Sequence, residues 1–132
     1  MIGGFPASDG GAYADFFEPV DGLVAFPGWE PFEGADSDDL DQEARDKLTA
    51  DMVPVLEGVS RGIVKLNDDR RFAVPLNLVC PEFSPDDAKE WIASGGIPEL
   101  TKVTNLVFTD IDSGHWPMVT QPAVLASLLV SP

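Results

Sequence analysis

The sequence has little cysteine and little histidine. Its 132 residues contain one of each, Cys80 and His115. A single cysteine excludes an internal disulfide and fits a reducing compartment; followed by Pro81 at a strand end, it is interpreted as a buried structural residue. With one thiol and one imidazole in the chain, we predict no metal site.

Positive charge is scarce as well. The chain has 8 Lys and Arg against 23 Asp and Glu, a formal net charge of −15 at pH 7. The excess is concentrated in residues 1–60, which hold 14 acids and 2 bases. Such a surface repels phosphate backbones and anionic lipids, so we expect neither a nucleic acid nor a membrane as a partner.

Long apolar runs and phosphate-binding loops are missing too. No apolar stretch approaches the ~20 residues of a membrane span, and no basic segment followed by a long apolar one opens the chain as in a signal peptide. Gly3-Gly4 and Gly95-Gly96 lack the spacing of dinucleotide or Walker motifs. We therefore expect a cytoplasmic protein without a cofactor.

The clearest pattern in the sequence surrounds its only histidine. Residues 104–111 are rich in β-branched and aromatic side chains, as a buried strand should be. Residues 121–129 begin with a proline suited to a first helical turn and place three leucines on one face. The turn Gly114-His115-Trp116 is therefore predicted to lie between a strand and a helix.

A similar unit precedes it. Residues 76–80 are predicted to form a strand and residues 86–94 a helix, so the chain is assigned to the α/β class. Glu82 is the only acid on the loop before Pro85, and its simplest interpretation is an exposed acid of that loop. Asp86 and Asp87 are interpreted as first-turn acids of the helix.

These motifs resemble the last two strands, the acid loop, the histidine loop and the final helix of the α/β-hydrolase family. The resemblance implies a partial α/β-hydrolase fold, with C-terminal parallel strands and flanking helices preceded by a mostly helical and loop cap. It implies a strand remnant at residues 1–5, a cap region at 6–72, and a strand-helix-strand-helix part of the core at 73–132.

The resemblance also implies a chemistry, serine-type hydrolysis of an ester, amide or related small molecule. In that reaction an imidazole takes the serine proton, and a carboxylate orients the imidazole and stabilises its cation. His115 matches the family's general base. For the acid we favour Glu82, with Asp9 as the second choice, whereas Asp110 and Asp112 would not copy the family's geometry.

The nucleophile of this family is expected to lie outside the chain. It stands on a Gly-x-Ser-x-Gly turn, and the candidate at residues 6–10, with Ser8, has proline in place of the first glycine. The nucleophile half would have to precede Met1 and becomes an expected partner, and the chain alone is expected to be inactive. Two alternatives stay open: a non-catalytic module that binds a small ligand, and an inactive fragment.

Aromatic residues in proline- and glycine-rich loops mark the cap region. By analogy with the family, Trp29, Phe32 and Trp116 are expected to line an apolar substrate pocket; the alternative is that they pack the cap onto the sheet.

An amphipathic helix is predicted in the same region, from near Ser37 to the residues before Pro54. The acidic run 36–43 that opens it lacks the spacing of a calcium-binding loop. Ser37 and these acids are interpreted as capping groups at the start of the helix.

Overall fold

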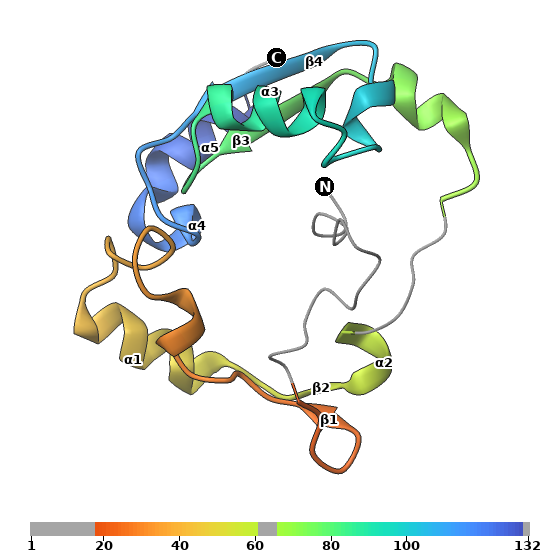
Figure 1. The fold of residues 1–132 in the computed structure, drawn as a ribbon. Helices are drawn as coiled ribbons and strands as arrows, with labels where there is room; N and C mark the ends of the chain where they lie inside the picture. The colour runs from red at the N-terminus through yellow and green to blue at the C-terminus, as the bar shows by residue number, and fades with distance from the viewer. Residues whose placement is uncertain (1–17, 61–65, 131–132) are drawn as a thin grey trace. The chain divides into compact units, whose positions relative to one another are not determined.

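The computed structural model describes residues 18–60 and 66–130 (Figure 1). The chain divides into two compact units: residues 1–31 with 42–67, and residues 32–41 with 68–132. Residues 32–41, predicted as part of the cap, thus group with the C-terminal part of the chain. The predicted strand remnant at 1–5, with Ser8 and Asp9, lies outside the described residues.

The first unit holds short elements. Strand β1 (Leu23–Val24) pairs antiparallel with β2 (Val55–Leu56), and the helices are α1 (Gln42–Asp51) and α2 (Glu57–Ser60). A tight turn at Asp21 and Gly22, with φ of 52° and 77°, precedes β1. The sequence did not predict β1 and β2, because two-residue strands leave no periodic pattern.

Helix α1 begins at Gln42, so its predicted start near Ser37 is wrong. Residues 35–39 form turns instead, and the Ser37 side chain is fully buried. Asp39 does not serve as a helix cap, because its carboxylate binds a distant loop described below.

The second unit is built on a parallel pair of strands, β3 (Leu76–Cys80) and β4 (Leu106–Asp110). Their register runs from Leu76 opposite Leu106 to Cys80 opposite Asp110. Both strands lie where the sequence predicted them, and the chain is a mixed α/β protein with a small parallel sheet. Because paired parallel strands end together, the segments that follow Cys80 and Asp110 leave the sheet at one edge.

Helix α3 (Pro85–Ala93) connects the two strands and lies against their sheet (Figure 1). Ser84 accepts a hydrogen bond from the Asp87 N–H, while the Asp87 carboxylate accepts one from the Ser84 N–H, a capping box completed by Pro85 in the first turn. The core of this unit comprises Leu40, Leu78, Cys80, Ala88, Ile97, Leu100 and Ile111. Short 3-10 helices at Asp69–Ala73 and Leu100–Lys102 flank it.

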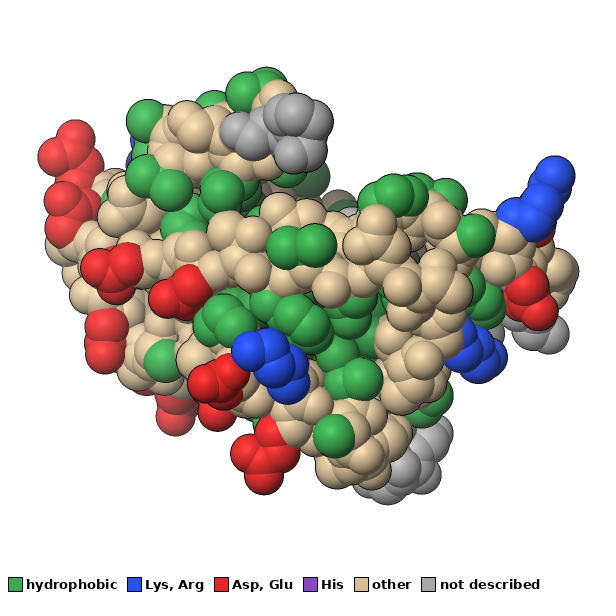
Figure 2. Space-filling view, turned by 90° about the horizontal axis from the view of Figure 1, so that it is seen from above, with side chains coloured by type: hydrophobic (Ala, Val, Ile, Leu, Met, Phe, Trp, Pro, Cys, Tyr) green, Lys and Arg blue, Asp and Glu red, His purple; other side chains and the backbone are tan. Residues whose placement is uncertain are grey.

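Two helices follow the histidine loop, α4 (Pro117–Thr120) and α5 (Pro122–Val130). The second corresponds to the predicted C-terminal helix. Its residues are almost all apolar, yet none is buried, and Leu129 and Val130 are largely exposed. Figure 2, a view from above, shows apolar side chains gathered at the surface of the molecule. Val107 of β4 is also exposed, so both the sheet and α5 present uncovered apolar groups.

Candidate catalytic site

The histidine loop leaves the end of β4 and is held by a distant turn of the same unit. The His115 N–H donates to the carbonyl oxygen of Asp36 at 2.7 Å. The neighbouring Gly114 N–H donates to Oδ2 of Asp39, also at 2.7 Å. These two bonds satisfy successive backbone donors of the loop and fix the position from which the imidazole projects.

Gly114 is required by this close approach. A Cβ atom at this position would lie 2.4 Å from the Asp36 carbonyl oxygen and 2.5 Å from Oδ1 of Asp39. Both distances are far below van der Waals contact, and one of the atoms belongs to the backbone. The glycine before the histidine therefore lets the acidic turn pack directly on the loop.

Side chains tie the other end of the loop to the residues that follow it. The hydroxyls of Ser113 and Thr120 lie 2.9 Å apart, within hydrogen-bonding distance. The Gln121 amide donates to the Asp112 carbonyl oxygen at 3.2 Å. The loop is thus anchored on both sides of His115, by the acidic turn and by the start of the C-terminal helices.

Glu82 lies beside His115. It follows β3 by two residues, and its Oε1 is 3.1 Å from Nδ1 of the imidazole. The Glu82 side chain is 20% exposed and that of His115 is 54% exposed. A mostly buried carboxylate therefore holds one edge of an imidazole that stays accessible to solvent, the arrangement that an acid and a general base need.

The pairing changes the proton affinities of both groups. The hydrogen bond to Glu82 raises the pKa of His115, assisted by the negative charges of Glu82 and Asp36 and opposed by partial burial. Burial alone would raise the pKa of Glu82, but the hydrogen bond and charge of His115 outweigh it and leave that pKa lowered. The imidazolium and the carboxylate stabilise each other.

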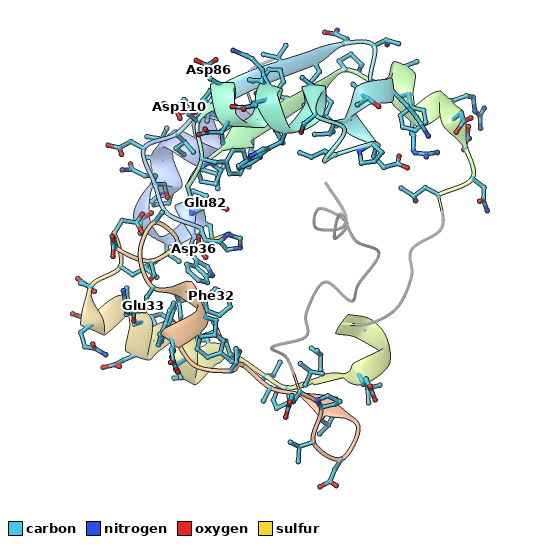
Figure 3. The ribbon with its side chains drawn as sticks, in the orientation of Figure 1. Phe32, Glu33, Asp36, Glu82, Asp86 and Asp110 are labelled. Atoms are coloured by element: carbon cyan, nitrogen blue, oxygen red, sulfur yellow. The ribbon has the colours of Figure 1, made fainter. Side chains whose placement is uncertain are left out.

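Asp36 is a third charged group at this site. One ligand-type atom each of Asp36, Glu82 and His115 lies within 4.8 Å of the others. Figure 3 shows the Asp36 and Glu82 side chains close together, although they come from different loops. Sequence reasoning missed Asp36 because the contact joins segments about eighty residues apart and leaves no local pattern.

Two aromatic rings accompany the imidazole. The ring of Trp116 packs edge-on against that of His115, with centroids 5.0 Å apart. It packs in the same manner against Phe32, at 5.6 Å. Of the three aromatic residues predicted to bind substrate, Trp116 thus contacts the histidine, and Phe32 contacts Trp116.

Trp29 belongs to the first compact unit and has its own partners there. Its indole N–H donates to the Thr49 hydroxyl at 3.0 Å, and the Arg45 guanidinium lies over its ring. Phe26 packs against it with centroids 5.1 Å apart. These contacts lie within the first unit, so both interpretations of Trp29, a place in a substrate pocket and packing of the cap onto the sheet, stay predictions.

A hollow of about 700 Å³ opens beside Glu82. Among the described residues its lining includes no lysine or arginine but six carboxylate residues: Asp38, Asp39, Glu82, Asp87, Asp110 and Asp112. The size suits a small molecule, and the negative field disfavours anions.

The remaining sequence candidates are placed as follows. Cys80 is fully buried, its Sγ lies 3.5 Å from the Leu78 carbonyl oxygen, and burial raises the pKa of its thiol, as expected of a structural residue. Asp86 and Asp87 lie in the first turn of α3, as predicted. Asp9, the second choice for the acid, lies outside the described residues.

Comparisons of the chain with protein-family models, with curated proteins and with solved structures found no match. Among the described residues, no helix combines the length and the apolar character needed to cross a bilayer.

Proposed function

We propose that this chain carries the acid and base of a serine-type hydrolase with a partial α/β-hydrolase fold. The observation that supports the proposal best is the 3.1 Å contact between Glu82 Oε1 and His115 Nδ1. It joins loops that follow two adjacent parallel strands, β3 and β4, in the chain order acid then histidine. That order and placement are those of the family the sequence resembles.

In this proposal His115 is the general base. Glu82 keeps the Nδ1 edge protonated, so Nε2 is free to take the proton of an attacking hydroxyl and later return it to the leaving group. Phe32 and Trp116 form an apolar wall beside the imidazole for the acyl or alcohol part of an ester, amide or related substrate.

In this proposal the serine stands on a Gly-x-Ser-x-Gly turn outside these 132 residues. The expectation that the sequence holds no such pentapeptide is wrong, because residues 58–62 read Gly-Val-Ser-Arg-Gly. Ser60, however, ends helix α2 after the two-residue strand β2, which pairs with β1 in a sheet separate from β3 and β4, whereas the family's serine stands on the turn between a core strand and the next helix. The exposed apolar side chains of β4 and α5 support this part of the proposal, because they offer a surface on which further strands could pack.

The test joins the chain to its nucleophile. The reading frame upstream of Met1 is searched for the pentapeptide, and the extended protein is assayed on a p-nitrophenyl ester. His115→Ala and Glu82→Gln should each lower the rate by several powers of ten, up to about 10⁴-fold. Glu90→Gln, an exposed acid of α3, is the matched control and should leave the rate unchanged.

Three results would overturn the proposal. The first is near-full activity in His115→Ala. The second is labelling of the 132-residue chain alone by a fluorophosphonate, since that would reveal a nucleophile within it. The third is the absence of any such pentapeptide in the upstream frame.

A further inference from the structure

We propose that Asp36, Glu82 and His115 bind a divalent transition-metal ion of the Zn²⁺ class. The three residues come from the turn 35–39, the loop after β3 and the loop after β4, all within the second compact unit. One donor atom from each lies within 4.8 Å of the other two. Two carboxylates and one imidazole form a donor set that zinc accepts.

The spacing of two of the donors suits a shared ion. Zinc-ligand bonds of about 2.0–2.2 Å in tetrahedral geometry place two ligand atoms about 3.4 Å apart. Nδ1 of His115 and Oε1 of Glu82 are 3.1 Å apart, held now by a hydrogen bond. An ion can take the place of the shared hydrogen after a movement of a few tenths of an ångström.

A second observation points to the same place. Oε2 of Glu82 is shielded from solvent and has no hydrogen-bond partner in the part of the chain that the structure describes. A buried carboxylate oxygen without a partner is costly. An ion that replaces the shared hydrogen at Oε1 would also satisfy Oε2 if Glu82 binds it through both oxygens.

The backbone around the donors is already positioned. The hydrogen bond from the His115 N–H to the Asp36 carbonyl oxygen, at 2.7 Å, joins the two loops that carry these ligands. Gly114 and Asp39 add a second bond between the same loops. Fixed backbones lower the entropy that is lost when ligands converge on an ion.

The donor set also selects the kind of ion. Calcium takes 6–8 oxygen ligands, whereas an imidazole favours zinc and its neighbours. Two carboxylates and a neutral imidazole balance the 2+ charge, and three protein ligands leave a position for water. The proton is accounted for in either starting state: a neutral imidazole moves its Nδ1 proton to Nε2 through solvent, and an imidazolium releases one proton.

With the ion on Nδ1, Nε2 of His115 carries the ring proton and cannot accept one from an attacking hydroxyl, so the ion would inhibit hydrolysis. Only this consequence rests on the proposed function. Binding itself is measured on the chain alone, without substrate or nucleophile. Its failure is thus distinct from a failure of the hydrolase proposal.

The experiment titrates tag-free, metal-stripped protein with Zn²⁺ by calorimetry. One ion should bind per chain, and Asp36→Asn and His115→Gln should each weaken binding by at least about tenfold. Asp38→Asn removes a neighbouring exposed acid and is the control. Its dissociation constant for Zn²⁺ should stay within about twofold of the parent's. Circular dichroism verifies that each variant keeps the parent's fold.

A spectroscopic readout on the unmodified chain avoids dependence on the variants. Because His115 is the only histidine, its ring signals in a ¹H–¹⁵N spectrum are unambiguous and should shift on Zn²⁺ addition. The proposal is overturned if those signals stay in place, if Ca²⁺ binds as tightly as Zn²⁺, if Asp38→Asn weakens binding as much as Asp36→Asn, or if no heat of binding is seen at millimolar Zn²⁺.

Discussion

The backbone N–H of His115 donates a hydrogen bond to the carbonyl oxygen of Asp36 at 2.7 Å. This bond joins the acidic turn at residues 35–39 to the loop after β4. The imidazole is therefore positioned from two directions: its main chain by Asp36 and its ring by Glu82. Neither contact lies within a helix or strand, so the geometry of the site depends on how loops pack on one another.

Gly114→Ala should test that packing. The added methyl would meet the Asp36 carbonyl oxygen at 2.4 Å, so the turn and the loop must separate. We expect a loss of about 1–3 kcal/mol in the free energy of unfolding, the usual cost of overpacking, measured by urea denaturation.

Gly58→Ala is the matched control for that variant. Gly58 lies in α2 without a positive φ, and a methyl group added there would meet no atom of the described residues within 4 Å, so alanine should be neutral or slightly stabilising. Equal losses in the two variants would contradict a specific contact at Gly114.

Asp39→Ala should weaken the same contact from the other side. It leaves the Gly114 N–H without its carboxylate acceptor, at an expected cost of about 1–3 kcal/mol in unfolding free energy. Burial alone would raise the pKa of Asp39, but its hydrogen bonds from Gly114, Thr120 and Ser113 leave it lowered. A carboxylate whose pKa is lower in the folded than in the unfolded protein stabilises the fold at pH values above its unfolded pKa. This stabilisation is lost as the pH falls through the folded pKa.

The difference in unfolding free energy between the parent and Asp39→Ala should therefore be largest near neutral pH. It should shrink as the pH falls below the ordinary aspartate pKa of 3.8. Asp38→Ala removes an adjacent exposed acid and is expected to change stability by less than about 0.5 kcal/mol. A pH-independent difference for Asp39→Ala would contradict a role for its charge.

The sequence predicted the parts of this site that follow local rules. β-branched and aromatic residues predicted β4, and Asp86 and Asp87 were interpreted as first-turn acids of α3. The strand β3 and the pairing of Glu82 with His115 followed from the family resemblance.

What the sequence could not reveal depends on contacts between distant loops. Asp36 and Asp39 look like helix-capping acids, and the capping rule considers only the next few residues. In the structure Asp39 binds Gly114, 75 residues away. Gly114, the glycine before the histidine, indicated that another segment packs closely against the loop. A glycine does not identify which segment that is.

Ser84→Ala should test how firmly the loop carrying Glu82 is held. It removes the hydroxyl that accepts from the Asp87 N–H at the start of α3, two residues after Glu82. We expect unfolding free energy to fall by about 0.5–2 kcal/mol, the range for losing a helix cap, in thermal and urea denaturation.

Ser127→Ala is the control for this cap. Its hydroxyl bonds back to the Ala123 carbonyl oxygen within α5, so alanine, a better helix former, should be neutral or slightly stabilising there. If Ser84→Ala proved as harmless as Ser127→Ala, the capping box would contribute nothing to stability.

The titration of His115 should report its pairing with Glu82 directly. In metal-free protein its ring signals, the only imidazole signals of the chain, should titrate above the ordinary value of 6.5, because the hydrogen bond and charge of Glu82 favour the imidazolium. Glu82→Gln removes that charge and should lower the pKa of His115, whereas Glu90→Gln should leave it unchanged. An identical titration in parent and Glu82→Gln would show that the pair does not form.

The same pair sets the sign of a pH-dependent stability difference between parent and Glu82→Gln. The raised pKa of His115 contributes stability that is fully present below pH 6.5, its ordinary pKa, and is lost as the pH rises through the pKa of the folded protein. The lowered pKa of Glu82 contributes stability that is present above pH 4.5, its ordinary pKa, and is lost as the pH falls through the pKa of the folded protein. The parent's advantage in urea denaturation should therefore peak between pH 4.5 and 6.5 and decline on both sides. An advantage that kept growing above neutral pH would contradict a charged pair, because the imidazole is then losing the proton on which the attraction depends.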